Sequence, residues 1–342
     1  VGDFAELAQS IDQTSPAPGE PDFRGWEWYF HKARLDARVK SLPVDISNAT
    51  WMLDGSHFIL AVRPTILELW DANRLESLAR IDIGMPVNRM RTSPSGQKLA
   101  IGGNARKIRI VDLVTFTVTG EFQPLEQAQS ISEFDNLVGL AWSPDETHIV
   151  AATHGGQIFK IRVSDGMAIR LDDSEGHAYG LDWHPDGTRI AVGLWHGSRY
   201  ILDLQTNEKQ WLSGVSDERG HGIRWSPDGR LLAVSEDSLV RVLDDQQRVV
   251  ASFQGHRGRV GPIVWLDNIR FATIGIADQT CKIWNIEEQQ FEKSLPSNGI
   301  RPNFIAISPD EQRVISIDQG ATQIVQVSEH KPANILNFGP SL

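Results

Sequence analysis

The sequence predicts an all-β protein, and three observations support this fold class. A turn signal of the form aromatic-Ser-Pro-Asp-Gly recurs in three clear and four weaker copies, the copies are almost evenly spaced, and short apolar runs flank them. They begin at Trp51, Thr92, Trp142, Trp183, Trp225, Trp265 and Ile307. The second gap is 50 residues and the others are 40 to 42. Because a period of roughly 40 to 45 residues with four short strands per unit is typical of a β-propeller, we expect seven blades.

Each repeat unit is expected to form one blade. An apolar strand leads into the turn, where Pro sets φ and Gly accepts positive φ. A second strand follows, as at Arg189–Gly193, and a third ends in a Trp-Asp-like pair, as at Trp70-Asp71. The aromatic residue before each turn is expected to fill the wedge between blades. We therefore assign three residues to the inter-blade core: Trp142, Trp183 and Trp225.

The N-terminal segment has a different pattern. Phe4, Leu7 and Ile11 are spaced for one apolar helix face, and a Pro-rich stretch separates them from a second helical stripe that begins at Trp26. We therefore expect a short N-terminal helical hairpin over residues 1–36 and the propeller over residues 37–342. The chain starts at Val1 without an initiator Met, so we expect a fragment or a processed chain.

Two segments compete to be the outermost strand of the last blade. Arg38–Leu42 precedes the first repeat, and Ile335–Phe338 follows the seventh. We favour the N-terminal segment, because this closure ties both ends of the array together and removes an open sheet edge.

Composition narrows the possible partners. The net charge of -11 opposes binding to nucleic acid and to anionic membranes. No apolar run approaches the roughly 18 residues of a membrane span. The single cysteine, Cys281, excludes an internal disulfide and a cysteine-rich metal site. No hydrolase, P-loop or dinucleotide-binding motif is present, so we expect neither catalysis nor a cofactor or metal.

From Trp51 to about Val327 the units resemble WD40 repeats, a resemblance that covers most of the chain. In that family a Gly-His pair, a hydroxyl residue, an Asp and a Trp form a buried hydrogen-bonded tetrad. In the sixth repeat Gly255-His256, Asp278 and Trp284 match this pattern. Ile274 occupies the hydroxyl position in direct register, and Thr273 serves only if the strand carries a bulge.

A second resemblance concerns Asp22–Tyr29. This run is similar to a segment that precedes WD40 arrays in multidomain planctomycete proteins, including WD40-containing Ser/Thr kinases. The resemblance implies a bacterial lineage and a larger parent chain, whereas no kinase motif is present in this sequence.

The histidines fall mostly on one face, where His256 is a tetrad residue and the others are either solvated loop residues or part of a recognition surface. In a propeller, the loops before first strands and the hairpins between second and third strands share one face, which we call the top face. Five histidines are expected there: His154, His177, His196, His221 and His256. Trp195 lies beside one of them, whereas His184 falls within a turn on the opposite face.

Aligning the repeats identifies a rim position four residues before each turn. Its occupants are Ser47, Asn88, Val138, Tyr179, His221, Gly261 and Asn303. Arg259 and Arg301 lie two residues earlier in their repeats and could pair with an acidic ligand. Our candidate partner-binding residues are therefore Tyr179, Trp195, His196, His221, Asn88, Asn303, Arg259 and Arg301.

These features favour a non-catalytic scaffold that binds a peptide or partner domain on the top face, as a monomer or as a module of a larger chain. We expect no nucleic-acid partner and no membrane insertion. An alternative is a propeller that binds a small molecule or metal, with possible hydrolytic activity, at the channel mouth near His154, His177, His196 and His221. A third is a structural regulatory module of a larger enzyme.

Overall fold

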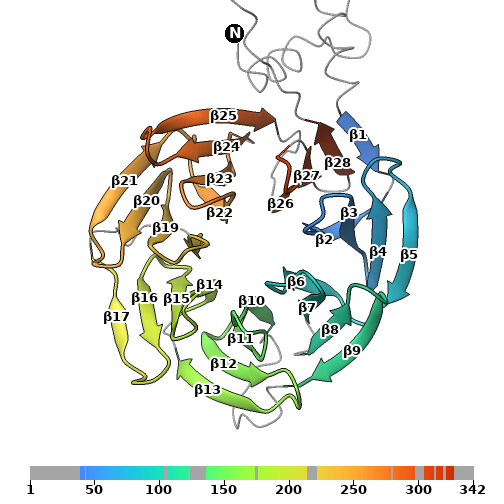
Figure 1. Cartoon of the computed structure of the whole chain (residues 1–342), viewed down its shortest axis with the longest axis horizontal. Helices are drawn as coiled ribbons and strands as arrows, with labels where there is room; N and C mark the ends of the chain where they lie inside the picture. The colour runs from blue at the N-terminus through green and yellow to red at the C-terminus, as the bar shows by residue number, and fades with distance from the viewer. Residues whose placement is uncertain are drawn as a thin grey trace, which may run out of the picture.

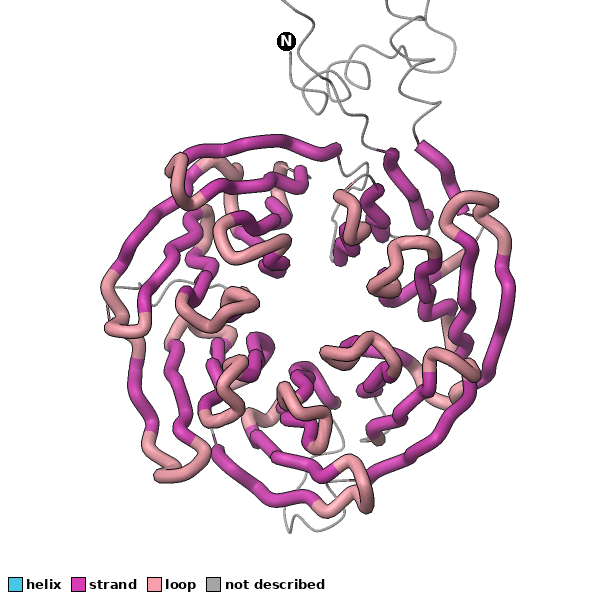
Figure 2. Tube along the Cα trace, viewed as in Figure 1, coloured by secondary structure: helices cyan, strands magenta, loops and turns pink. Residues whose placement is uncertain are grey.

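The computed structural model describes residues 39–42, 44–103, 107–123, 136–173, 176–213, 222–278, 280–296, 304–311, 313–318 and 321–326. The expected helical hairpin over residues 1–36 lies outside this part of the chain, as does the competing closing segment Ile335–Phe338. Only strands and loops occur in the described residues (Figure 2).

The described strands form seven four-stranded antiparallel sheets that stand as blades around a common axis (Figure 1). Blade 1 consists of β2 (Ile46–Trp51), β3 (His57–Val62), β4 (Ile66–Asp71) and β5 (Ser77–Asp82). Blade 2 consists of β6 (Val87–Thr92), β7 (Lys98–Gly103), β8 (Ile108–Asp112) and β9 (Thr117–Phe122). Blade 3 consists of β10 (Leu137–Trp142), β11 (His148–Thr153), β12 (Gln157–Arg162) and β13 (Ala168–Asp173). The all-β prediction and the number of blades are therefore confirmed.

The remaining four blades follow the same order from the axis outward. Blade 4 consists of β14 (Ala178–Trp183), β15 (Arg189–Leu194), β16 (Arg199–Asp203) and β17 (Lys209–Trp211). Blade 5 consists of β18 (Ile223–Trp225), β19 (Leu231–Glu236), β20 (Leu239–Asp244) and β21 (Val249–Gln254). Blade 6 consists of β22 (Val260–Trp265), β23 (Arg270–Gly275), β24 (Thr280–Asn285) and β25 (Gln290–Pro296). Blade 7 consists of β26 (Phe304–Ile307), β27 (Arg313–Asp318), β28 (Ala321–Gln326) and β1 (Val39–Leu42).

The ring closes through the N-terminal segment. Strand β1 pairs antiparallel with β28, in a register that runs from Val39 opposite Val325 to Leu42 opposite Thr322. The predicted closing segment is therefore confirmed. Blade 7 thus combines β1 from the N-terminal end of the repeats with β26, β27 and β28 from the C-terminal end. The ring therefore cannot open between blades 7 and 1 unless the hydrogen bonds between β1 and β28 break.

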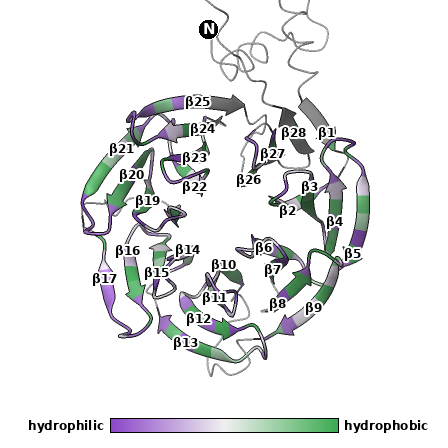
Figure 3. Ribbon diagram, viewed as in Figure 1, coloured by the Kyte–Doolittle hydropathy of each residue, from purple (hydrophilic) through white to green (hydrophobic). Residues whose placement is uncertain are grey.

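In blade 4 the hydropathy of a strand follows its depth within the blade. The outer strand β17 is hydrophilic and exposed, whereas its neighbour β16 is buried over most of its length and carries hydrophobic residues (Figure 3). The main apolar clusters combine residues of adjacent blades. Ala141 and Val150 of blade 3, for example, pack in one cluster with Leu181 and Trp183 of blade 4. The core is therefore a series of wedges between blades.

The tryptophans of the inner strands connect successive blades. Trp142, Trp183 and Trp225 are all buried. The Trp51 Nε1–H donates to the Ala306 carbonyl of blade 7 at 3.1 Å, and the Trp142 Nε1–H donates to the Arg91 carbonyl of blade 2 at 2.8 Å. Each of these two bonds satisfies a buried indole donor across a blade boundary.

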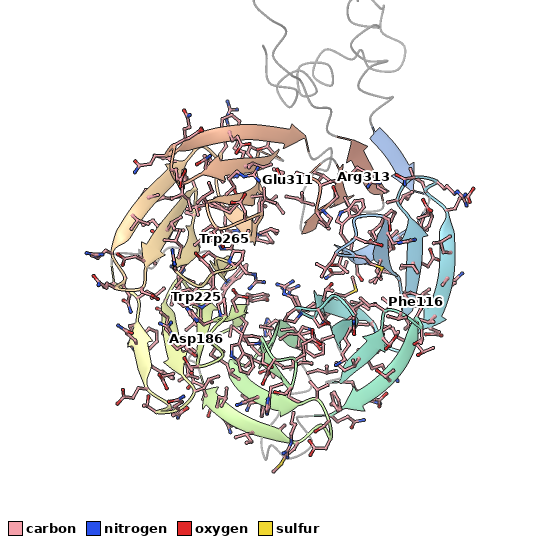
Figure 4. The ribbon with its side chains drawn as sticks, in the orientation of Figure 1. Phe116, Asp186, Trp225, Trp265, Glu311 and Arg313 are labelled. Carbon is pink, nitrogen blue, oxygen red and sulfur yellow. The ribbon has the colours of Figure 1, made fainter. Side chains whose placement is uncertain are left out.

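Arginines at the start of second strands make a second set of connections on the turn side. Arg313 of blade 7 lies 5.0 Å from the Trp51 ring centre of blade 1 and donates to the Gly55 carbonyl at 2.8 Å. Arg270 of blade 6 forms a two-pronged bond with Glu311 at 2.9 and 3.0 Å. Figure 4 shows Glu311 and Arg313 on blade 7. Glu311 joins this blade to blade 6, and Arg313 joins it to blade 1.

Candidate functional site

Five side chains from blades 3 and 4 form one cluster, which we call the top-face patch: His154, His177, Tyr179, Trp195 and His196. The ring centres of His154 and His177 are 3.7 Å apart, and those of Tyr179 and Trp195 are 5.2 Å apart. Tyr179 lies 6.2 Å from each of the first two imidazoles, and His177 lies 6.4 Å from His196. His196 is exposed and the other four are half-buried.

Antiparallel pairing explains why these residues meet. Ala178, the first residue of β14, lies opposite Leu194, the last residue of β15. The loop before β14 and the hairpin after β15 therefore share one edge of blade 4. The Trp195 main-chain N–H donates to the His177 carbonyl at 2.8 Å. The His177 Nδ1–H also donates to the His154 carbonyl, which attaches the blade 4 loop to the blade 3 hairpin.

A buried arginine fixes the hairpin that carries Trp195 and His196. Arg199 is 2% exposed, and its guanidinium donates to the Gly197 carbonyl within the hairpin and to the Ser235 carbonyl of blade 5. The hairpin is thus anchored on its own blade and on the next one, so the aromatic group is presented on a rigid support.

Arg89 of blade 2 and Arg259, which precedes the first strand of blade 6, extend the patch. The Arg89 guanidinium of β6 lies 5.9 Å from the Tyr179 ring centre, and that of Arg259 lies 5.1 Å from the Trp195 ring centre. Both distances allow a cation–π interaction. The Arg89 Nε–H also donates to the Val138 carbonyl of blade 3 at 2.7 Å.

The structure brings together four of the eight predicted partner-binding residues. Tyr179, Trp195 and His196 belong to the top-face patch, and Arg259 lies against it. Asn88 is half-buried on β6, and its carbonyl accepts a hydrogen bond from Arg89 at 2.9 Å. The other three lie outside the described residues: His221, Arg301 and Asn303.

Sequence reasoning missed Arg89, the neighbour of the rim residue Asn88. The pairing of β6 with β7 shifts register between Val87 and Arg89, so counting back from the turn does not identify which residue extends toward the next blade. A positive charge on an inner strand of an acidic protein was the available signal.

Blade 6 carries a buried hydrogen-bonded chain. The Trp284 Nε1–H donates to Thr273 Oγ1 at 2.7 Å, and this oxygen lies 2.8 Å from His256 Nε2. His256 Nδ1 lies 3.0 Å from Asp278 Oδ2, so its N–H donates to the carboxylate. A Cβ on Gly275 would lie 1.8 Å from Asp278 Oδ1, which explains the glycine at that position.

The hydroxyl in this chain belongs to Thr273 and not to Ile274. A register shift is present, but it lies between Val260 and Ile263 of the neighbouring strand β22, whereas β23 pairs with β24 without interruption. Thr273 therefore supplies the hydroxyl although the register shift lies in the neighbouring strand, so the stated condition of a bulge in its own strand was wrong. The residues that pairing makes equivalent in blades 1 to 5 are all apolar: Leu60, Ile101, Ala151, Val192 and Val234.

His184 lies in the turn between β14 and β15, away from the top-face patch. Its Nε2 lies 2.9 Å from the Gly229 carbonyl of blade 5, and its Nδ1 lies 2.9 Å from Asp186 Oδ2. This buried imidazole therefore links two turns, which is a structural role. Figure 4 shows Asp186 beside Trp225 on the boundary between these blades.

The described residues contain neither a metal-binding cluster nor a helix that could span a membrane. No group of three or more His, Cys, Asp or Glu side chains in this part of the chain is arranged to hold a metal ion. No helix among the described residues is long and apolar enough to cross a membrane.

Comparison with known proteins agrees with the repeat pattern. Residues 210–244 match the family model "WD domain, G-beta repeat". The β-propeller domain of Cps50 (Swd1) from Myceliophteria thermophila superposes with a TM-score of 0.68 at 13% identity, over 84% of this chain and 98% of that domain. At this identity the match shows the fold, a β-propeller.

Curated relatives match over shorter stretches. The WD repeat-containing protein 26 homolog of Arabidopsis thaliana is 24% identical over 44% of this chain and 26% of its own length. The mouse Echinoderm microtubule-associated protein-like 4 is 25% identical over 54% of this chain and 19% of its own length. The WD repeat-containing protein SL1-17 of Schistosoma mansoni is 28% identical over 31% of this chain and 35% of its own length. The chain thus spans between a fifth and about a third of these relatives.

The fold is a β-propeller, and the recurrent turn and these matches together support a propeller of the WD40 type. The three relatives named above are eukaryotic. The bacterial lineage implied by the N-terminal segment stays a prediction.

Proposed function

We propose that this propeller is a protein-interaction scaffold and that the top-face patch is the surface on which a peptide or partner domain docks. Similarity to WD40-repeat proteins supports the general role, because these propellers commonly bind proteins or peptides. The observation that carries the choice of surface is the Tyr179–Trp195 pair, which is half-buried and flanked by Arg89 and Arg259.

These residue types suit an interface anchor. Trp, Tyr and Arg dominate binding energy at interfaces, because their rings and planar guanidinium bury a large area while keeping a polar edge. Each ring already packs against a neighbour, so a partner would restrict few additional rotamers on binding. The half-buried state leaves part of each ring available for contact.

The two arginines favour a partner segment that carries an acidic group. Arg259 approaches Trp195 from blade 6, and Arg89 approaches Tyr179 from blade 2. Both lie on a protein whose net charge is -11, so the charge of the two arginines is opposite in sign to that of the protein as a whole. An acidic side chain next to an apolar one on the partner would match both features.

A displayed peptide library provides the test, because no partner need be known in advance. Peptides selected on the full chain are measured by calorimetry against the parent, Trp195→Ala, Tyr179→Ala and Trp211→Ala. Trp211 is the matched control, since it is an exposed tryptophan on the outer strand β17.

We expect Trp195→Ala and Tyr179→Ala to weaken binding by about 1 to 3 kcal/mol and Trp211→Ala to leave it unchanged. Circular dichroism of each variant checks that the fold is intact. Peptides that bind the parent and both patch variants equally well would place the docking surface elsewhere.

A further inference from the structure

Three arginines on the inner strands form a second cationic feature, which we call the axial arginine cluster: Arg89 and Arg91 on β6, and Arg224 on β18. Within the described inner strands β2, β6, β10, β14, β18, β22 and β26, the only other charged side chain is Asp182 on β14. An acidic protein thus has an excess of two positive charges on the strands nearest its axis (Figure 1).

The repeat places three of these charged residues, Arg91, Asp182 and Arg224, at the same level of the inner strands. Arg91, Asp182 and Arg224 each precede the first residue of their turn, so they occupy equivalent positions in blades 2, 4 and 5. The equivalent residue of blade 3 is Ala141, whose side chain is one methyl group. The inner strands of these blades are in contact in the order β6, β10, β14, β18.

The charges of the cluster interact with one another. The Arg224 Nη1 atom lies 3.6 Å from Asp182 Oδ1, and 20% and 23% of these two side chains are exposed. Asp182 Oδ2 accepts the Trp225 main-chain N–H at 2.8 Å. The pKa of Arg91 is lowered to about 10, first by burial and then by the nearby charge of Arg89, while Asp182 acts in the opposite direction.

The arginines keep donors available for a ligand. A guanidinium has five N–H groups. The hydrogen bond from the Arg91 side chain to a described residue goes to the Met90 carbonyl at 3.2 Å. Arg224 donates to the Leu181 and Ile223 carbonyls through one nitrogen, Nη1. All three arginines are partly exposed, so the remaining donors can reach a small group placed at the axis.

We propose that the axial arginine cluster binds a phosphate monoester. The net charge of the cluster is +2 when Asp182 is ionised and +3 when it is protonated. A phosphate monoester carries between about -1.5 and -2 charges at pH 7 and has three acceptor oxygens, so it balances this charge more closely than one carboxylate does. The planar arginine fork matches the spacing of phosphate oxygens.

Calorimetry on the full chain tests this proposal at constant ionic strength, with inorganic phosphate and N-acetyl-phosphoserine amide as probes. The variants are Arg91→Ala, Arg224→Ala and Asp182→Asn. Arg230→Ala is the matched control, since Arg230 is 84% exposed on a turn and lies outside the cluster. These probes do not require a peptide to dock on the top-face patch. The cluster can therefore fail to bind phosphate while the proposed docking function holds, and it can bind phosphate while the docking function fails.

We expect each cluster arginine variant to weaken phosphate binding at least about tenfold, because a charge-assisted hydrogen bond is lost. Arg230→Ala is expected to match the parent. Asp182→Asn is expected to tighten binding, because it removes the one negative charge and keeps an oxygen for the Trp225 N–H. This gain does not depend on whether the alanine variants fold.

The two probes identify the source of the phosphate. Tighter binding of the phosphoserine amide supports a phosphorylated side chain of a partner, and equal binding of both probes supports a free phosphate compound. Failure of both to bind more tightly than chloride, equal binding by Arg91→Ala and Arg230→Ala, or weaker binding by Asp182→Asn would each overturn the proposal.

Discussion

Replacing Thr273 by Val tests the hydrogen-bonded chain of blade 6 with almost no change in side-chain volume. The hydroxyl accepts the Trp284 N–H at 2.7 Å and lies 2.8 Å from His256 Nε2. All three side chains are buried, so water cannot replace the lost partner. The variant leaves one buried donor and one buried acceptor without a bond.

The expected cost follows from these two groups. A buried polar group that loses its partner costs about 1 to 3 kcal/mol, so Thr273→Val should lower the free energy of unfolding by about 2 to 5 kcal/mol. Thr273→Ser is the control. It keeps the hydroxyl and loses one buried methyl group, which costs about 1 kcal/mol.

Urea denaturation of the parent and both variants, followed by tryptophan fluorescence, measures this difference. We expect Thr273→Val to be less stable than Thr273→Ser, although valine is the more apolar residue. If Thr273→Val is as stable as Thr273→Ser or more so, the hydrogen-bonded chain does not stabilise blade 6 and our reasoning is refuted.

Three further outcomes are expected. Arg313→Ala should lower the free energy of unfolding by about 2 to 3 kcal/mol in urea, because the contacts with Trp51 and two carbonyls of blade 1 are lost; no change would remove this residue from ring closure. Trp142→Ala should cost about 3 to 5 kcal/mol, whereas the exposed Trp211→Ala should melt like the parent; similar melting of both would contradict the inter-blade role. Burial raises the pKa of Asp182 from 3.8 to about 7, so the folded state holds a proton that the unfolded state has lost, and this stability disappears as pH rises between these values. Asp182→Asn should therefore stabilise the protein more at about pH 8 than at about pH 4, and an equal effect at both would refute this.

Local residue patterns were sufficient for the architecture. The turn signal depends on neighbouring residues and its spacing is visible along the chain, so seven blades could be counted from sequence. Val39–Leu42 could be assigned to the last blade, because a propeller gains stability by covering its open edge. The alternation of loops between two faces also predicted that His154, His177 and His196 share a face with Tyr179 and Trp195, and these side chains lie close together.

The strand register could not be predicted from the sequence pattern. Thr273 and Ile274 are adjacent, and a one-residue shift turns a strand side chain to the other face. A bulge in β22, a different strand, accompanies the geometry in which Thr273 bonds His256. A register shift on β6 is likewise the reason why the sequence pattern indicated Asn88 and not its neighbour Arg89.

The sequence by itself determined the repeat, the blade count, the closing strand and the face that carries the aromatic and histidine side chains, because each follows from residues close together in the chain. Tertiary structure alone decided which charged residues lie together; Arg259 was expected on this face, but its contact with Trp195 was not. Arg91, Asp182 and Arg224 come from three different repeats, and Arg259 reaches Trp195 from two blades away. Such groupings depend on how the blades are rotated about the axis and on side-chain reach, and no local pattern records either quantity.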